Sequence, residues 1–458
     1  MRKRSLWGTR FGFYLAAIGS AFGLGNLWRF PYVTVESGGG AFVLLYVFFA
    51  LVIGLPLLIA ELSLGKLTRR SVISACQRLA VDESISRAPR SKDIKGSSPW
   101  VWVGRVSVTC CLLVLSYYAV ISGWVLHFLM QFFVSQVQTG TFEVDQSLQI
   151  LRDNGFLQIA LMSVHLLITL VIVVKGVQEG IEKWVGNVMP IFIVLLVILV
   201  TKSLSLPTST DALRFMFYPD FTKLTVYSPL MAIGHVMFTL SIGLGTMVTF
   251  GSYLNDKTRI PSAGFAAEME REGFDIPLLI GGGFTTTGPE LLFQTLPRLL
   301  IDIDSGFVFG MAFFICLYLA ALGASIGLLE SVVANLLDFT KLSRAKAAWI
   351  TGVTATVIGA LPALSTSALK EVNIGGHGLL EILDAILIDA LLPLSALGIS
   401  FLIARKLRRD KAEAEFVNDE SVATQTLHSH WLFIIRWLAP ILIIGSLVLA
   451  GLGLVGLV

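Results

Sequence analysis

The chain has 458 residues, of which 55% are hydrophobic and 14% are charged, and its formal net charge is +3. A soluble domain carries charge on about a quarter of its residues, so this composition excludes an ordinary soluble protein. No basic patch indicates nucleic acid as a partner. No nucleophile–base arrangement, metal motif or nucleotide-binding loop indicates an enzyme.

Apolar runs long enough to cross a bilayer recur along the whole chain, which predicts an all-α polytopic membrane protein. The N-terminal run has no small-residue cleavage site, so we expect a span there and no signal peptide. We expect the four cysteines to be core residues. The expected spans are residues 11–33, 40–64, 101–133, 156–174, 184–204, 228–254, 306–337, 347–364, 378–404 and 431–457.

The charges in the connections predict the orientation. Lysine and arginine gather at the N-terminus and in the connections that follow the spans 40–64, 306–337 and 378–404. Residues 134–155, in contrast, hold one arginine and no lysine. Since basic connections stay on the cytoplasmic side, we expect a cytoplasmic N-terminus in a cell (inner or plasma) membrane.

Residues 262–284, where a seventh span should lie, are atypical. Each charge costs ~2.5–3.5 kcal/mol at the centre of a spanning helix, so this stretch should not insert by itself. The orientation of the later connections nevertheless requires a crossing here. The stretch is either a shortened element shielded by protein, using residues 276–284, or a local anomaly such as a compensated frameshift. Its charges are Glu268, Glu270, Arg271, Glu272 and Asp275.

The first span should be a regular helix, yet Gly23 and Gly25 flank Leu24, and Asn26 and Arg29 follow at membrane depth. Glycine weakens a helix, and buried polar groups are costly unless they face a protein interior or a cavity. One interpretation is a glycine packing face, with the arginine reaching to the interface. We favour a broken helix whose unwound backbone binds a ligand and ions near the midplane.

The sixth span repeats this pattern, since residues 242–245 (Ile-Gly-Leu-Gly) echo residues 22–25 (Phe-Gly-Leu-Gly). Two glycine-interrupted helices five spans apart are typical of an inverted-repeat transporter with its site between the breaks. We therefore expect a single transmembrane domain, 1–458. Its parts are a first repeat (11–204), a second repeat (228–404) and an additional terminal helix (431–457).

The ends of a broken helix carry partial charges that match a bound amino acid and a cation. Freed amides at a helix N-terminus favour a carboxylate. Freed carbonyls, with the side-chain oxygens of Asn26 and Thr239, suit a hard cation. The alternative for the Thr239 and Ser241 hydroxyls is a hydrogen bond back to their own helix.

The chain resembles the neurotransmitter:sodium symporter family, bacterial type, over almost its whole length, most weakly in 262–284. The resemblance implies five-plus-five inverted repeats with broken first and sixth helices, about 11 spans, and import of an amino acid by sodium symport with alternating access. The matching segments are residues 7–10, 19–31, 36–42, 117–124, 238–245, 288–297 and 337–344.

The resemblance implies a substrate carboxylate on the Leu24 and Gly25 amides and the Tyr118 hydroxyl. Gly23 stands where monoamine carriers of the family have an aspartate, which indicates an amino acid as substrate. The implied substrate-binding residues are Ala21, Gly23, Leu24, Gly25, Val114, Tyr118, Phe238, Thr239, Ser241, Leu244, Ala324 and Leu328.

The resemblance also implies gates and a hinge. Arg29 and Asp384 would form the extracellular gate. Arg4 and Asp338, with Trp7 beside them, would form the cytoplasmic gate, although Asp338 is alternatively a solvated carboxylate at a helix end. Gly180 and Pro190 match a hinge element of the fifth span.

The implied sodium ligands are incomplete. One site would use Ala21, Asn26, Thr239, the substrate and a seventh-span residue. The other would use the carbonyls of Gly19, Phe22 and Ala320 with two hydroxyls, but those two positions are Gly323 and Ala324 here, so Ser325 or water would have to substitute.

These gaps leave other driving ions and functions open. Asp389 and His235 are titratable groups at membrane depth, so proton coupling is an alternative to sodium coupling, and uniport is another. An equal alternative for Asp389 is a hydrogen bond between helices. His235 also replaces a glutamine of the family's chloride position, with Tyr46 and Ser241. A degenerate sensor or binding protein without turnover is a further alternative.

Overall fold

A computed structural model describes residues 5–81, 98–138, 142–207, 209–255, 291–374, 377–407 and 422–454. The described residues include eight helices long and apolar enough to cross a membrane. The expected all-α polytopic fold is confirmed. The eight are Gly40–Thr68, Val101–Val137, Gly155–Val174, Val177–Leu204, Gly306–Phe339, Arg344–Leu364, Leu379–Lys406 and His428–Leu452.

Two further expected spans, the first and the sixth, are each divided into short helices. The first comprises α1 (Arg10–Ala21), η1 (Gly25–Arg29) and α2 (Phe30–Glu36). The sixth comprises α11 (Ser228–Thr239) and α12 (Thr246–Ser252).

The remaining elements follow in chain order. The first half continues with α3 (Gly40–Phe49), η2 (Ala50–Gly54), α4 (Leu55–Thr68), α5 (Val72–Val81), α6 (Val101–Gln138), α7 (Val144–Asp153), α8 (Gly155–Val174), η3 (Val177–Glu182), α9 (Lys183–Leu204), α10 (Ser209–Phe217) and η4 (Phe221–Lys223). The second half contains η6 (Leu291–Thr295), α14 (Leu296–Ile301), α15 (Gly306–Phe339), α16 (Arg344–Leu364), β1 (Asn373–Ile374), β2 (His377–Gly378), α17 (Leu379–Ala385), η7 (Ile386–Leu391), α18 (Leu392–Lys406), α20 (Val422–Phe433), η8 (Ile434–Leu438) and α21 (Ala439–Leu454).

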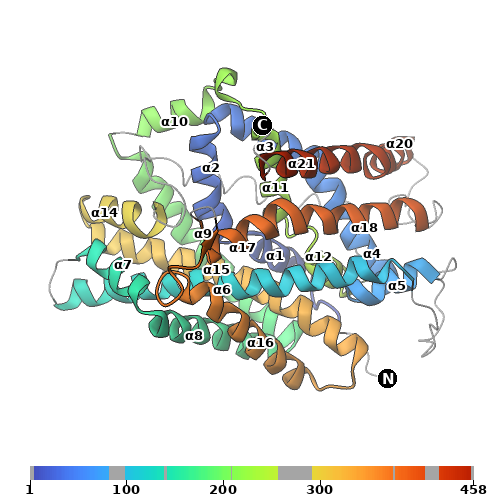
Figure 1. Cartoon of the computed structure of the whole chain (residues 1–458), viewed down its shortest axis with the longest axis horizontal. Helices are drawn as coiled ribbons and strands as arrows, with labels where there is room; N and C mark the ends of the chain where they lie inside the picture. Colours follow the sequence, from blue (N-terminus) through green and yellow to red (C-terminus); the bar gives the residue numbers. More distant parts are fainter. Residues whose placement is uncertain are drawn as a thin grey trace.

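The long helices α6 and α15 pack against each other, and α4, α6 and α21 each contact α18 (Figure 1). Figure 1 shows α7 and α14 at one end of the bundle and α5 at the other. Stacked and tilted aromatic rings fill the core between α6 and α15. Apolar residues of α9 such as Val194 and Val197 are exposed, as expected for a helix facing lipid.

The first break is a real interruption of the helix. The Thr9 hydroxyl caps α1 by accepting a hydrogen bond from the amide of Gly12, and α1 ends at Ala21. Phe22 then adopts an extended conformation (φ −82°, ψ 93°), and the chain resumes as a π-helical turn. The broken helix predicted from Gly23 and Gly25 is confirmed.

The second break lies between α11 and α12. Ser241, Gly243 and Gly245 have positive φ angles of 54°, 84° and 70°. Glycine adopts this backbone conformation readily, whereas a serine is uncommon there. The two breaks are therefore built differently, by an extended residue in the first span and by left-handed residues in the sixth.

The predicted hinge also coincides with irregular helix. Gly180 lies in η3, a π-helical segment, and Pro190 lies inside α9. A Cβ on Gly180 would lie 2.2 Å from the carbonyl oxygen of Ile172, so only glycine fits there. The atypical stretch 262–284 lies outside the described residues.

Candidate functional site

Two neighbouring cavities lie at the helix breaks. The inner cavity has about 320 Å³ of empty volume and the outer one about 260 Å³. Tyr118 and Phe238 line both cavities and lie at their boundary. The inner cavity is lined by Ser20, Ala21, Gly23, Asn26, Val114, Tyr118, Phe238, Thr239, Ser241, Leu244, Ala324 and Leu328. The outer cavity is lined by Leu24, Gly25, Arg29, Tyr117, Tyr118, Ile121, Phe238 and Asp384.

All the residues expected to bind substrate therefore line one cavity or the other. The structure brings them together from α1, η1, α6, α11, α15 and the two helix breaks, and their roles as ligands stay a prediction. Ser20 was not predicted, because nothing in the sequence distinguishes its hydroxyl from those of other buried serines.

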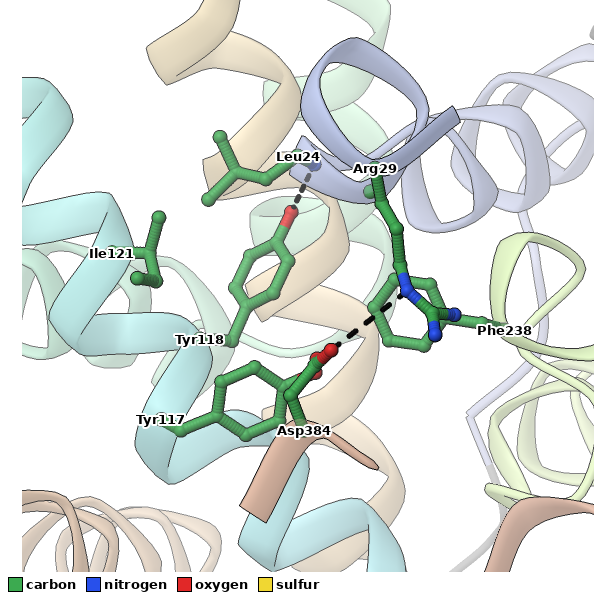
Figure 2. A pocket seen from close by; sticks show the side chains of 8 residues that line it. Leu24, Arg29, Tyr117, Tyr118, Ile121, Phe238 and Asp384 are labelled. Atoms are coloured by element: carbon green, nitrogen blue, oxygen red, sulfur yellow. Dashed lines mark hydrogen bonds and ion pairs between the residues drawn. The ribbon is translucent and has the colours of Figure 1, made fainter. Parts of the chain in front are cut away.

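The group expected to receive a carboxylate is preassembled. The amide of Leu24 donates a 2.7 Å hydrogen bond to the Tyr118 hydroxyl oxygen (Figure 2). Because the phenol oxygen accepts this bond, its own O–H stays free to donate. Two of the three predicted carboxylate donors, the Leu24 amide and the Tyr118 hydroxyl, therefore lie together between η1 and α6. In this structure the amide is bound to the phenol oxygen, so the phenol O–H is the donor left for a substrate.

Glycine is required at the first break by close approach. A Cβ on Gly25 would lie 2.3 Å from a ring carbon of Phe238, and one on Gly23 would lie 2.7 Å from the Tyr118 hydroxyl oxygen. An aspartate at Gly23, as in the monoamine carriers, has no room in this arrangement.

The first predicted cation position is largely assembled. Ala21, Asn26 and Thr239 line the same inner cavity. The Thr239 hydroxyl donates to the carbonyl of His235 at 2.7 Å, so it bonds back to its own helix, but its lone pairs remain available to a cation. Ser241 does not bond back, since its hydroxyl donates across to the carbonyl of Ser20 at 3.4 Å.

The second predicted cation position is not assembled in this way. A Cβ on Gly323 would lie 2.5 Å from the carbonyl oxygen of Gly19, so α1 and α15 approach too closely for a serine there. The Ser325 hydroxyl lies 2.8 Å from Nε2 of His165 on α8. Residues two apart point to opposite sides of an α-helix, so Ser325 faces away from α1. In this structure Ser325 therefore bonds to α8, and its role as a substitute sodium ligand stays a prediction.

The two residues of the predicted outer gate form an ion pair, and an additional acid lies beside them. The Arg29 guanidinium lies 3.8 Å from Asp384 and 3.5 Å from Asp389 (Figure 2 shows the first contact). Asp389 therefore lies beside the predicted gate. It forms an ion pair with Arg29, and this contact replaces our alternative of a hydrogen bond between helices.

The predicted inner gate is present in part. Trp7 is buried, and its indole N–H donates to the carbonyl of Phe250 at 3.1 Å. Asp338 is not a solvated carboxylate, because it pairs with Arg70 and accepts from the amide and hydroxyl of Ser71. Arg4, its expected partner, lies outside the described residues.

Close to the inner gate is a buried ion pair that the sequence analysis missed. Glu330 is completely buried, pairs with Arg344 and accepts a 2.6 Å hydrogen bond from the Tyr253 hydroxyl. Arg344 also donates to the carbonyl of Val173 at 2.8 Å. This Glu330 cluster (Glu330, Arg344, Tyr253) joins α15 and α16 to α8 and to the chain just after α12.

A second missed carboxylate supports the break of the sixth span. Glu61, buried in α4, accepts a 2.7 Å hydrogen bond from the amide of Gly243. The hydroxyls of Ser107 and Ser395 both donate to the carbonyl of Gly243 at 2.7 Å. Three helices therefore hold the two peptide groups that flank the Cα of Gly243 in the unwound conformation. An ionisable residue inside an apolar span indicates a functional role, so the sequence alone could have pointed to Glu61.

Two further groups of contacts involve residues that do not line either cavity. His235 stacks on Phe30 at 5.3 Å and lies 5.4 Å from the Tyr46 ring, so two of the three residues of the predicted chloride position lie together. At the exposed end of the bundle, hydrogen bonds from Arg298 and Gln294 lower the pKa of Asp145.

The fold and this site define a membrane transporter: a helical bundle with two broken helices, a cavity at the breaks and an ion-paired gate above it. The family model described as the sodium:neurotransmitter symporter family matches residues 4–147 and 138–269. The chain belongs to this family.

Individual relatives agree with this assignment. A sodium-dependent transporter of Bacillus subtilis named YhdH, described as uncharacterized, is 32% identical over 454 residues, covering 96% of each chain. The mouse sodium-dependent neutral amino acid transporter B(0)AT2 is 30% identical over 286 residues, 55% of this chain and 36% of that protein. The crystal structure of MhsT in complex with L-phenylalanine matches with a TM-score of 0.87 and 33% identity, covering 98% of this chain and 100% of that chain.

Proposed function

We propose that the protein imports an amino acid by sodium symport, with alternating access through the Arg29–Asp384 gate and a cytoplasmic gate at Asp338. The observation that carries this proposal is the pair of adjoining cavities at the helix breaks. Leu24 and Tyr118 line the outer cavity, and Tyr118, Asn26 and Thr239 line the inner one. The protein would lie in the cell membrane with its N-terminus in the cytoplasm, as the basic connections indicate.

The lining of the inner cavity supports a neutral amino acid as substrate. The Tyr118 hydroxyl lines the inner cavity, and the Leu24 amide lies beside it in the outer one, so a carboxylate would bind at their boundary. The rest of the inner wall is mainly apolar, with Val114, Leu244 and Leu328, and none of the described residues that line it is charged. The relatives MhsT, solved with L-phenylalanine, and B(0)AT2 agree with this substrate class.

Sodium at the first cation position would be the driving ion. A hard cation prefers several oxygen ligands, and this position has them on both broken helices. At the second cation position, the close packing of Gly323 against α1 leaves no room for a hydroxyl ligand. This favours a carrier that depends on fewer sodium ions than the family pattern implies. Proton coupling and uniport are the alternatives.

Uptake into proteoliposomes tests the proposal. A panel of radiolabelled amino acids would be offered with and without sodium and pH gradients. We expect uptake of a neutral amino acid that follows the sodium gradient. Uptake that is unchanged when sodium is replaced would refute sodium symport, and substrate binding without uptake would indicate a sensor.

Replacing Asn26 by alanine is expected to abolish sodium-driven uptake while leaving membrane insertion intact. The substitution removes the only side-chain amide of the inner cavity, and with it an oxygen ligand of the first cation position. The control is Asn187→Ala, an exposed asparagine on α9. Normal sodium-dependent transport in Asn26→Ala would refute this placement of the ion.

Replacing Tyr118 by phenylalanine is expected to weaken substrate binding on the order of 10- to 100-fold. The phenol is expected to donate to the substrate carboxylate, and hydrogen bonds to charged groups contribute about 1.5–3 kcal/mol. Binding to the purified protein would be measured by scintillation proximity. Tyr218→Phe, at an exposed tyrosine, is the matched control, and equal affinities in both variants would contradict the assignment.

A further inference from the structure

The outer gate contains more negative than positive charge. Among the described residues, Arg29 is the one cation paired with these acids, and it lies 3.8 Å from the carboxylate of Asp384 and 3.5 Å from that of Asp389. The side chains of these acids are 19% and 27% exposed, and that of Arg29 is 10% exposed. A guanidinium neutralises only one carboxylate, so the three side chains carry one excess negative charge when both acids are ionised.

A π-helical segment is what brings the second acid to Arg29. Asp384 lies in α17 and Asp389 lies five residues later, inside η7. In an α-helix, residues five apart differ by about 140° around the axis and would not share a partner. In a π-turn the hydrogen bond joins residues five apart, so the two carboxylates come to the same side. Such segments occur frequently at functional sites.

The described residues of α6, α11, α18 and α21 supply no second positive charge beside the pair. From α6, Tyr117 faces Asp384 (Figure 2), and its buried hydroxyl has no partner with hydrogen-bond geometry among the described residues. From α11, Gly234 faces Asp389, while the neighbouring His235 is stacked on Phe30. The described part of α21 has no ionisable side chain, and the basic residues of α18 lie in its last turn.

This excess charge has a consequence for closure. When the gate is open, water solvates both carboxylates. When the gate closes as in this structure, an uncompensated charge is left with little solvent, which is costly. Binding of one proton by the pair of carboxylates that flank Arg29 relieves this cost, because the three side chains then carry no net charge. The Tyr117 hydroxyl lies beside Asp384 (Figure 2).

We propose that Asp384 and Asp389 form a proton-binding site, which takes up one proton from the outer side as the Arg29 gate closes. This inference rests on the proposed function, in which closure of that gate captures the substrate. Because the closed state binds the proton, acid on the outer side favours closure. Substrate affinity should therefore rise as the outside pH falls, by at most about tenfold per pH unit for one proton.

Infrared spectroscopy tests the site without any substrate. Difference spectra between the native protein and Asp389→Asn would be recorded at neutral pH in light and heavy water. We expect the native protein to show one protonated-carboxyl band that shifts in heavy water and is absent in Asp389→Asn. Glu381→Gln, which removes an exposed acid from the same helix, should keep the band. A native spectrum with only ionised carboxylates at this site, or a band that sodium removes, would overturn the proposal.

The second test measures proton uptake when substrate binds. In weakly buffered solution, the native protein and Glu381→Gln should take up one proton per bound amino acid, and Asp389→Asn should take up none and bind with little dependence on pH. Asp389→Glu, which keeps an acid, should restore proton uptake. Native pH dependence in Asp389→Asn would refute the proton site and leave the transport function standing. If no amino acid binds at any pH, the transport function fails, and the infrared band still decides the proton site.

Discussion

Replacing Arg344 by methionine is expected to lower the free energy of unfolding by about 3–5 kcal/mol. Arg344 is the ion-pair partner of Glu330, whose carboxylate is completely buried between α15, α16 and the end of α12. Without the guanidinium, the buried Glu330 keeps the hydrogen bond from the Tyr253 hydroxyl but loses its positively charged partner among the described residues. An uncompensated buried charge is among the few causes of so large an effect.

Thermal unfolding in detergent, followed by fluorescence-detected size exclusion, measures this prediction. The double variant Arg344→Met/Glu330→Leu should regain most of the lost stability, because it removes both charges at once. Arg298→Met serves as the matched control. It breaks the ion pair with Asp145, in which both side chains are more than half exposed, and should cost at most about 1 kcal/mol. Equal melting temperatures for Arg344→Met and Arg298→Met would contradict the argument.

The position of the Glu330 cluster gives it a role in the transport cycle proposed above. Tyr253 lies at the end of α12, the inner half of the broken sixth span, and its carbonyl accepts the amide of Trp7 at 3.0 Å. The inner halves of both broken helices are therefore tied to each other, and through Glu330 to α15 and α16. Opening toward the cytoplasm would require at least one of these bonds to break.

The helix breaks could be predicted from the sequence because each carries a local signal. Gly23 and Gly25 lie next to polar residues at membrane depth, and Gly243 and Gly245 repeat the spacing. The resemblance to a family then supplied the cavity residues, and the structure places all of them at the two breaks. The element boundaries followed from the apolar runs.

The contacts that complete the site could not be predicted, because they join residues far apart in the chain. The partner of Glu61 lies 182 residues away, and only the folded structure identifies it as the Gly243 amide. Asp389 reaches Arg29 through a π-helical segment, which helical spacing does not indicate. Ser325 seemed available to a cation because its side of α15 cannot be known before α8 is placed.

Glu61 is the other position where a single substitution should have a large effect. Glu61→Ala is expected to reduce substrate affinity on the order of 10- to 100-fold, because a buried amide left without an acceptor costs about 1–3 kcal/mol. That amide belongs to Gly243, in the left-handed turn between Ser241 and Leu244, which both line the inner cavity. Once the amide is released, the turn no longer holds these two residues in place.

Hydrogen exchange and substrate binding together test this prediction. In Glu61→Ala, amides of residues 240–245 should exchange faster than in the native protein, and affinity should fall in parallel. Glu61→Gln keeps an oxygen acceptor for the Gly243 amide and should retain more of both properties. Ser395→Ala is the control, because Ser107 still donates to the Gly243 carbonyl at 2.7 Å after Ser395 is removed. Native exchange and native affinity in Glu61→Ala would show that the turn holds its conformation without the carboxylate.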